Sequence, residues 1–147
     1  MELAQLVDGF VHKPTQTDGP GVDLTVSAVA RVTTPGRVDF GGSELDPADR
    51  EPIDPEYRNL DDEYGWWHLE GGSYLMDYNE SVAVPADRTL FVQTRDEMRI
   101  SGAHHPTIVV ASDRPIDGMP LVVPAAGLRL KENARDSTLY SAAPRSG

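Results

Sequence analysis

The chain contains no cysteine and only two lysines. Without cysteine, disulfide bonds, thiol nucleophiles and thiolate metal sites are excluded. No apolar run approaches the roughly 20 residues that a membrane-spanning helix needs. The first residues, Met1 to Phe10, have neither the basic start nor the long apolar centre of a signal peptide. We therefore predict a cytoplasmic protein with no membrane partner.

Basic residues are few relative to acidic ones. There are 13 Lys and Arg residues against 24 Asp and Glu residues, which gives a formal net charge of -11. Such a surface repels nucleic acid and anionic membranes. The acid-rich, lysine-poor composition resembles that of proteins from salt-loving organisms, where high salt screens the repulsion between like charges. The composition therefore predicts a halophilic protein that does not bind nucleic acid.

Helix signals are scarce as well. Only Glu2 to Phe10 has the spacing of a short amphipathic helix, with its leucines on one face. Beyond it, 12 Pro and 13 Gly residues interrupt the chain at short intervals. The apolar or alternating runs between them predict an all-β sandwich or barrel. The runs expected to form strands are "VDLTVSAVARV" (22–32), "RVDF" (37–40), "WWHL" (66–69), "SYLMDY" (73–78), "SVAVP" (81–85), "TLFVQT" (89–94), "TIVVAS" (107–112), "PLVVP" (120–124), "GLRL" (127–130) and "STLYSA" (137–142).

The length is that of one ordinary domain, and we expect a single domain over residues 1–147. Segment 41–64 is acidic and proline-rich, which is typical of a long excursion over the surface rather than of a second domain. The tail 143–147 is expected to be flexible.

The segment "TRDEMRISGAHHP" (94–106) concentrates charge between two apolar runs. Arg95 and Arg99 are candidates to clamp phosphates, because a guanidinium matches phosphate oxygens in bidentate geometry. Asp96 and Glu97 would repel the same phosphates unless a divalent cation lies between them. Intramolecular pairing of the arginines with these carboxylates is the simpler alternative, and residue chemistry leaves both open.

Three other groups are candidates for a site, and each has a simpler explanation. His104 and His105 invite a metal interpretation, but adjacent residues of a strand point to opposite faces, which favours turn histidines. Trp66 and Trp67 resemble a stacking platform, although one ring in the core and one against a neighbour is the commoner arrangement. Asp113 is a candidate general base, but its neighbourhood is also ordinary turn chemistry.

Three stretches, in order, resemble segments of the dUTP diphosphatase and dCTP deaminase superfamily, in particular of its archaeal branch. The first is "QTDGPGVDLTV" (16–26) with "GRVDF" (36–40), which is similar to the superfamily's opening segment. The second, "GGSYLMDYNESVAVPADRTLFVQTR" (71–95), resembles the segment that leads into its phosphate motif. The third, "GLRLKENARDSTLY" (127–140), looks like its closing strand pair.

The resemblance implies a distorted β-barrel or jelly-roll domain that assembles as a homotrimer, with active sites at subunit interfaces. It implies hydrolysis of dUTP to dUMP and diphosphate, with Mg²⁺ on the triphosphate and a carboxylate that activates water. On this chain, Arg95 would contact phosphate, Asp113 would be the base, and Gly21 to Asp23 would help to build the nucleotide pocket.

The chain departs from the superfamily's phosphate motif, which reads Arg-Ser-Ser-Leu, then a second Arg, then Gly-Ala. Arg95 and Gly102 are retained, while Arg99 does not stand at the position of the motif's second arginine. Asp96 and Glu97 stand where serines would donate hydrogen bonds to phosphate, and an ionised acid cannot donate. The two acids are therefore candidate Mg²⁺ ligands, and Arg95, Arg99 and Gly102 are candidate phosphate-binding residues.

Other departures bear on the reaction. The strand 120–125 lacks the glutamate that a deaminase of this superfamily carries, so deamination is not expected. Asp113 lies five residues before Gly118, which is the spacing expected between the hydrolase base and the glycine turn that follows it. An alignment that starts from Thr107 instead puts Ala111 at the position of the base. Ile116 falls where an aromatic ring would stack on the deoxyribose. The prediction is a dUTP hydrolase. The alternative is a non-catalytic or redirected paralogue that binds a nucleotide or a partner subunit.

Overall fold

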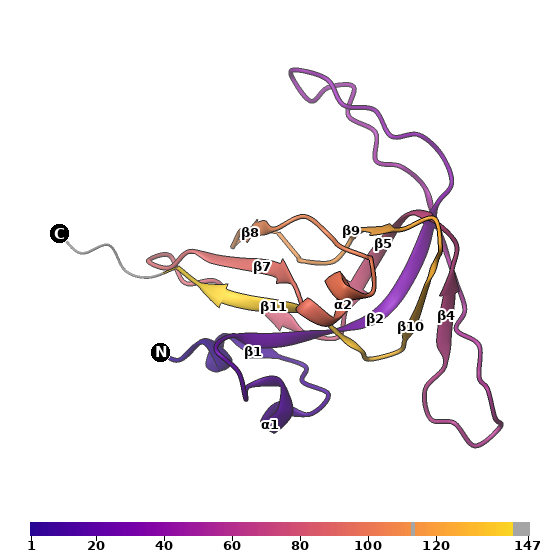
Figure 1. The fold of residues 1–147 in the computed structure, drawn as a ribbon. Coiled ribbons are helices and arrows are strands. Elements are labelled where there is room, and N and C mark those ends of the chain that lie inside the picture. Colours follow the sequence, from indigo (N-terminus) through magenta and orange to yellow (C-terminus); the bar gives the residue numbers. More distant parts are fainter. Residues whose placement is uncertain (113, 143–147) are drawn as a thin grey trace.

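The computed structural model of the protein describes residues 1–112 and 114–142, and strands dominate it (Figure 1). The prediction of an all-β fold is confirmed, while the predicted flexible tail lies outside the described residues. The elements in chain order are η1 (Leu3–Leu6), β1 (Val7–Asp8), α1 (Lys13–Gln16), β2 (Val22–Val32), β3 (Arg50–Pro52), β4 (Trp66–Leu69), β5 (Gly72–Tyr78), β6 (Ser81–Val82), β7 (Leu90–Thr94), α2 (Asp96–Ile100), β8 (Ile108–Val110), β9 (Met119–Val123), β10 (Leu128–Lys131) and β11 (Arg135–Ser141).

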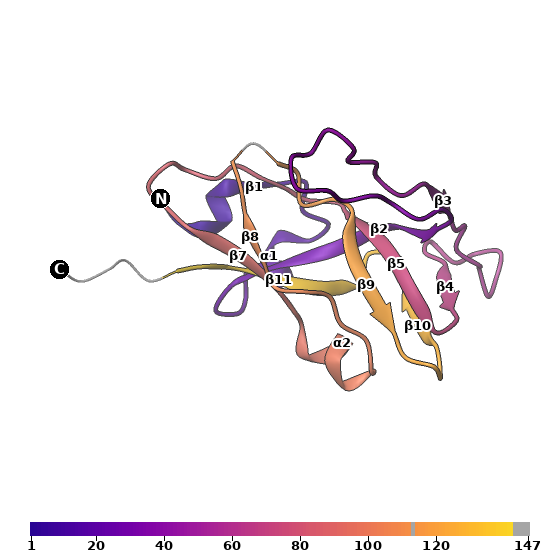
Figure 2. The same cartoon turned by 90° about the horizontal axis from the view of Figure 1, so that it is seen from above.

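The main sheet is antiparallel and has seven strands in the order β8-β7-β11-β2-β5-β9, with β3 paired to β2. The register shifts at two places, in β2 between Val26 and Ala28 opposite β5, and in β11 between Arg135 and Ser137 opposite β2. Each extra residue bends its strand and increases the local twist. The sheet therefore curls into a half-barrel, which is seen from above in Figure 2.

Two short strand pairs, β1–β6 and β4–β10, form separate two-stranded sheets next to the curled sheet. In β9 and β10, buried and exposed residues alternate, so that one face of each strand packs inward. Trp67 on β4 is the largest fully buried side chain, and it packs with the inward residues of β2, β5, β7, β9 and β11 in one core. Within the described residues, no helix is long and apolar enough to cross a membrane.

The predicted helix over Glu2 to Phe10 is wrong in extent. A single 3-10 turn covers Leu3–Leu6, and the chain then becomes strand β1, which pairs with β6. The Leu6 carbonyl accepts from the amide of Ala83 at 2.8 Å, and Gly9 adopts a φ of 90° that ends regular structure. Strand pairing prevails because so short a helix is marginal in water.

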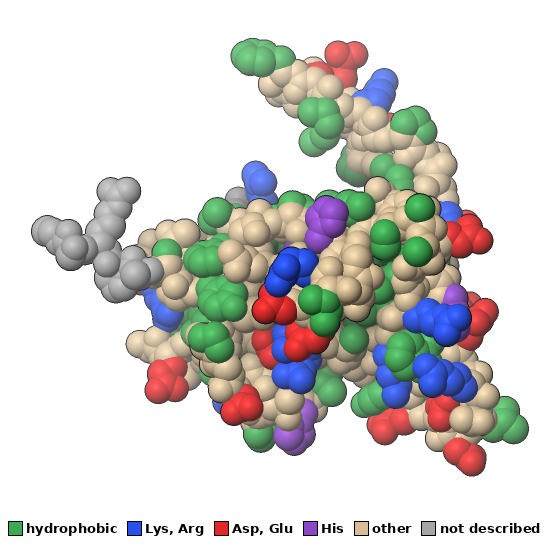
Figure 3. All heavy atoms as spheres, in the orientation of Figure 1, with side chains coloured by type: hydrophobic (Ala, Val, Ile, Leu, Met, Phe, Trp, Pro, Cys, Tyr) green, Lys and Arg blue, Asp and Glu red, His purple; other side chains and the backbone are tan. Residues whose placement is uncertain are grey.

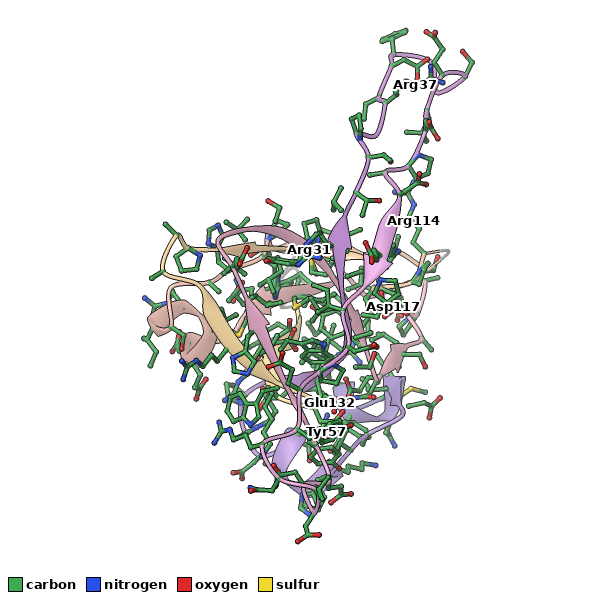
Figure 4. All side chains as sticks on the ribbon, turned by 90° about the vertical axis from the view of Figure 1, so that its right-hand side faces the viewer. Arg31, Arg37, Tyr57, Arg114, Asp117 and Glu132 are labelled. Atoms are coloured by element: carbon green, nitrogen blue, oxygen red, sulfur yellow. The ribbon has the colours of Figure 1, made fainter. Side chains whose placement is uncertain are left out.

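An arm, residues 33–49, extends away from the half-barrel (Figures 1 and 4). Its two sides are joined by backbone hydrogen bonds, from the Thr33 amide to the Asp49 carbonyl at 2.9 Å and in both directions between Arg37 and Asp46. At the tip, the Asp39 carboxylate accepts from the amides of Gly42 and Glu44. The run 37–40, predicted as a strand, forms only the isolated bridge of Arg37 to Asp46.

Candidate active site

The three segments that carry the family resemblance meet at one pocket of about 420 Å³. The loop after α1 and the start of β2 supply one wall, the end of β7 and the start of α2 supply the second, and β11 supplies the third. Acidic and basic side chains alternate over α2 in the middle of Figure 3. The lining residues are Thr15, Asp18, Gly19, Pro20, Asp23, Gln93, Thr94, Arg95, Asp96, Glu97, Arg135, Thr138 and Tyr140.

Arg95 lies where β7 ends and α2 begins, and its side chain is 16% exposed. Its Nε lies 3.6 Å from an oxygen of Asp23, and its Nη2 lies 3.2 Å from an oxygen of Glu97. Its Nη1 donates to the carbonyl of Arg135 at 3.3 Å. The backbone amide of Arg95 donates to the carbonyl of Asp136 on β11. The guanidinium is therefore held in one position, with Glu97 occupying the side that faces the pocket.

Asp23 on β2 connects the arginines of the site. Its Oδ2 lies 3.1 Å from the Nη1 of Arg135, and its Oδ1 accepts from the Thr138 hydroxyl at 2.9 Å. Because its side chain is only 14% exposed, these charge-assisted contacts are sheltered from solvent. Asp23 therefore holds the guanidiniums of Arg95 and Arg135 next to each other, and its carboxylate is not free to act as a base.

Two buried side chains hold the first wall of the pocket in place. Gln16 donates to the carbonyl of Asp23 and to the carboxylate of Glu80, both at 2.9 Å. Glu80 also accepts from the amide and the hydroxyl of Thr25. Gln16 and Glu80 are 2% and 3% exposed, so this fully hydrogen-bonded pair is costly to disturb. Both residues belong to the resemblance segments, and they act here by positioning Asp23.

The pocket carries more acid than base. Asp18, Asp23, Asp96 and Glu97 line it against two arginines. Asp96 pairs with Arg99 at 3.1 Å, and both side chains are exposed. In the described ranges, no group of three or more His, Cys, Asp or Glu residues is placed to hold a metal ion. The residues thus offer Mg²⁺ one or two carboxylates, which is how Mg²⁺ is commonly held when substrate phosphates complete its coordination.

Tyr140 on β11 lines the pocket and stacks on Phe91 of β7, with ring centroids 5.7 Å apart. Sequence reasoning missed this aromatic face, as it missed Arg135 and Thr138. All three side chains lie on β11 within the third resemblance segment, and the pairing of β11 with β2 and β7 brings them to the site. The spacing of two between Thr138 and Tyr140 was the available signal for that pair, whereas the bulge between Arg135 and Ser137 puts Arg135 out of step with them.

A buried polar chain lies behind β11. The Ser137 hydroxyl contacts the Tyr78 hydroxyl and the Nε2 of His105, each at 2.7 Å. The carbonyl of Pro106 accepts from Nδ1 of His105, so Nε2 carries no proton and accepts from the Ser137 hydroxyl. This sets the direction of each hydrogen bond in the chain. Burial lowers the pKa of His105 and raises the pKa of Tyr78, so both are neutral.

Some predicted site residues lie elsewhere. Gly21 does not line this pocket, and a Cβ there would approach the Leu139 carbonyl to 2.5 Å, so glycine lets the loop pack against β11. Gly102 lies beyond the end of α2 with a φ of 89° and faces Pro124. Arg99 does not line the pocket, and its guanidinium pairs with the lining residue Asp96. Asp113 lies outside the described residues.

The other candidate groups are resolved by burial. Trp67 is buried and Trp66 is half-buried under Arg58, which agrees with one ring in the core and one against a neighbour. His104 is exposed and His105 is buried, so the two rings do not meet on one ion. The interpretation of His105 as a turn residue is wrong, because Ser137 draws it into the core.

A comparison of structures defines the class of fold. The structure matches the crystal structure of a 2'-deoxycytidine 5'-triphosphate deaminase from Agrobacterium tumefaciens with a TM-score of 0.60 and 12% identity. The match covers 92% of this chain and 43% of that one, so this chain spans less than half of its length. At this identity the likeness concerns the fold alone, which is the curled β-fold of that deaminase.

Sequence comparisons define the family, although no family model matches the chain. The chain is 32% identical over 132 residues to the probable deoxyuridine 5'-triphosphate nucleotidohydrolase of Methanosarcina acetivorans, a match covering 88% of this chain and 74% of the relative. The protein of the same name from Halobacterium salinarum is 35% identical over 78 residues, which are 53% of this chain and 46% of that protein. The chain belongs to this nucleotidohydrolase family, which confirms the resemblance.

Proposed function

We propose that the protein hydrolyses dUTP to dUMP and diphosphate in the pocket around Arg95. The observation that carries the proposal is that the three family-like segments converge there, although they are far apart in the sequence. Two arginines oriented by one aspartate are suited to the oxygens of a triphosphate. The stacked Tyr140 offers an aromatic face to the base or the sugar.

Each residue has a separate role in this proposal. Arg95 and Arg135 bind phosphate oxygens, and Asp23 holds both guanidiniums in place. Glu97, which pairs with Arg95 in the free protein, must turn away when the triphosphate enters, and its 63% exposed side chain leaves room for that movement. Asp113 remains the proposed base that activates water, as the family resemblance implies.

Mg²⁺ belongs to the same proposal. Asp96 and Glu97 face the pocket and are the proposed carboxylate ligands, with the phosphates supplying the remaining oxygens. When bound, the ion would neutralise part of the triphosphate charge. Such neutralisation is needed because four acids and two arginines line the pocket. Arg99, Gly102 and Gly21 then support the site from outside it.

Assembly and location are further parts of the proposal. We expect a homotrimer with each site close to a subunit contact, in a cytoplasm of high salt, as the family resemblance and the acidic composition suggest. Deamination of dCTP is not part of the proposed activity, because β9 carries no acidic residue.

The test is to incubate the purified protein with dUTP or dCTP and Mg²⁺ in high salt and to measure diphosphate and ammonia. We expect diphosphate from dUTP and no ammonia from dCTP. Arg95→Gln should lower kcat/KM by roughly a hundredfold, since charged hydrogen bonds contribute up to about 3 kcal/mol. The matched control is Arg50→Gln, which removes a surface pair with Asp77 and should leave turnover unchanged.

Absence of diphosphate at high enzyme concentration would refute hydrolysis. A rise in melting temperature on adding dUTP with Mg²⁺, without product, would instead support the non-catalytic alternative, in which the protein binds nucleotide only.

A further inference from the structure

The arm (residues 33–49) is ordered within itself but packs against nothing else in the described part of the chain. Its side chains are exposed except for those of Asp39 and Ala48, which are half-buried. Val38, Phe40 and Leu45 near its tip are 91%, 109% and 60% exposed. Apolar side chains gathered on a preformed projection are typical of a surface that is covered by a partner.

The charge of the arm indicates what kind of partner it fits. Asp39, Glu44, Asp46 and Asp49 stand against a single basic residue, Arg37, so the arm carries a net charge of -3 (1 minus 4). In a chain with so few basic residues, a complementary cationic surface should be easy to identify.

Such a surface lies on the outer side of β4 and β10. We call it the basic face, formed by Arg58, Trp66, His68, Arg129 and Lys131. One acid lies within it, Glu56, whose carboxylate is 3.3 Å from Nε2 of His68. The register pairs Arg129 with His68 and Lys131 with Trp66, so their side chains project together from one side of the strand pair. Arg58 lies 4.2 Å and Lys131 5.6 Å from the centre of the Trp66 ring. In Figure 3, Lys and Arg side chains gather at the right-hand side, where β4 and β10 lie, with Asp and Glu side chains beside them.

A hollow adjoins the basic face and is large enough for the tip of the arm. Its volume is about 680 Å³, and the turns after β4 and β9 form its walls. Ala125 and Ala126 give it a small apolar part, and Glu70 is the one acid in its lining. The side chains of Leu69 and Leu128 are buried in the core, while Arg129 belongs to both the hollow and the basic face. An acidic projection with an apolar tip therefore matches a basic surface that borders a partly apolar hollow.

The two surfaces cannot meet within one chain. In Figure 4 the tip of the arm, marked by Arg37, lies at the top, whereas Tyr57 and Glu132, the chain neighbours of Arg58 and Lys131, lie in the lower half of the molecule. Hydrogen bonds between its two sides and at Asp39 keep the arm formed, and the pairing of β3 with β2 anchors its base to the main sheet. We propose that the arm of one copy docks on the basic face and hollow of a second copy. Because two different surfaces meet, the contact runs head to tail and can close a ring.

The first test uses charge reversal and measures assembly by sedimentation velocity at micromolar concentration. Lys131→Glu alone and Asp46→Lys alone should each weaken self-association by about tenfold or more, since like charges then meet at the contact. A chain that carries both changes should regain most of the association, because the attractive pair is restored with its signs exchanged. Glu63→Lys, an exposed acid outside both surfaces, is the control and should not weaken association.

The second test uses the absence of natural cysteine. Phe40→Cys and Ala126→Cys chains carrying different tags are co-expressed and mildly oxidised, and we expect a disulfide between the two tagged chains. The pair Phe40→Cys with Ile100→Cys, where Ile100 is 78% exposed on α2, should not cross-link. Phe40 packs against nothing in its own chain, so its replacement should leave the folding of the monomer unchanged.

A monomeric wild type would overturn the proposal. It would also be overturned if both reversed chains assembled like the wild type, or if the Ile100→Cys pair cross-linked as well as the Ala126→Cys pair. None of these measurements depends on dUTP turnover, so failure of this contact is distinguishable from failure of the proposed hydrolysis.

Discussion

The carboxylate of Glu97 is paired with the guanidinium of Arg95, which is the group that the triphosphate is expected to contact. We predict that, at saturating Mg²⁺, Glu97→Gln lowers the KM for dUTP by up to about fivefold with little change in kcat, because an ion pair whose carboxylate is 63% exposed contributes about 0.2–1 kcal/mol. Steady-state kinetics at fixed Mg²⁺ measure this, with the remote, exposed Glu63→Gln as the control. At limiting Mg²⁺ the KM of the variant should rise instead, because Glu97 is also a proposed ligand of the ion. A KM that stays above the wild-type value at saturating Mg²⁺ would contradict the prediction.

Single residues of the site were predictable only as far as a linear motif specifies them. Arg95 and Asp23 were identified from the family pattern, and both line the pocket. Arg135 and Tyr140 were not, because they reach the pocket through the pairing of β11 with strands far away in the sequence. Arg99 follows Arg95 in the motif, but α2 begins between them and turns its side chain toward Asp96.

Among the elements, β11 carries an unusual buried acid at its irregular position. Asp136 is 0% exposed, and neither carboxylate oxygen has a hydrogen-bond partner in the described part of the chain. Burial, with a smaller contribution from the charge of Glu80, raises the pKa of Asp136 well above its ordinary value. The folded protein therefore keeps this carboxyl protonated at a pH where the unfolded chain has released the proton.

The sign of the resulting pH dependence follows from this difference. The native state binds the proton more tightly, so the stabilising contribution is complete below the unfolded pKa and is lost as the pH rises toward the folded pKa. We predict that Asp136→Asn resembles the wild type near the unfolded pKa. It should become progressively more stable than the wild type above it, by up to about 1.4 kcal/mol per pH unit.

Urea unfolding of both proteins at a series of pH values measures the difference. The exposed Asp87→Asn is the control, and its difference from the wild type should not vary with pH in this way. A constant difference between Asp136→Asn and the wild type across the pH range would contradict the raised pKa.

Strands were predictable from the sequence where buried and exposed residues alternate, as in β9 and β10. The N-terminal helix was predicted too long because its leucine spacing also suits a turn followed by a strand. There, the long-range pairing of β1 with β6 decides the outcome. The bulge that places Asp136 inside the protein depends on the register of β11 against β2, which no local pattern specifies.

At the scale of the whole molecule, short strands separated by turns indicated the class of fold but not its projections. Composition drew attention to residues 41–64, whereas the arm that leaves the half-barrel comprises residues 33–49. The hydrogen bonds between Thr33 and Asp49 and between Arg37 and Asp46 determine these limits. They join positions whose sequence has no strand signal in common, so the arm could not be read from periodicity.

The net charge of -11 has a consequence for the molecule as a whole. Acids spread over a small surface repel one another, and added salt screens that repulsion more than it weakens the few surface ion pairs. We predict that the melting temperature rises by several degrees between low and molar KCl.

The double variant Asp61→Asn with Glu63→Gln, in an exposed loop, should be more stable than the wild type at low salt and equal to it at high salt. Calorimetry in KCl and in sucrose measures this, because sucrose stabilises by exclusion without screening charge and should preserve the difference between the two proteins. If the difference persisted in molar KCl, repulsion between charges would not be its cause.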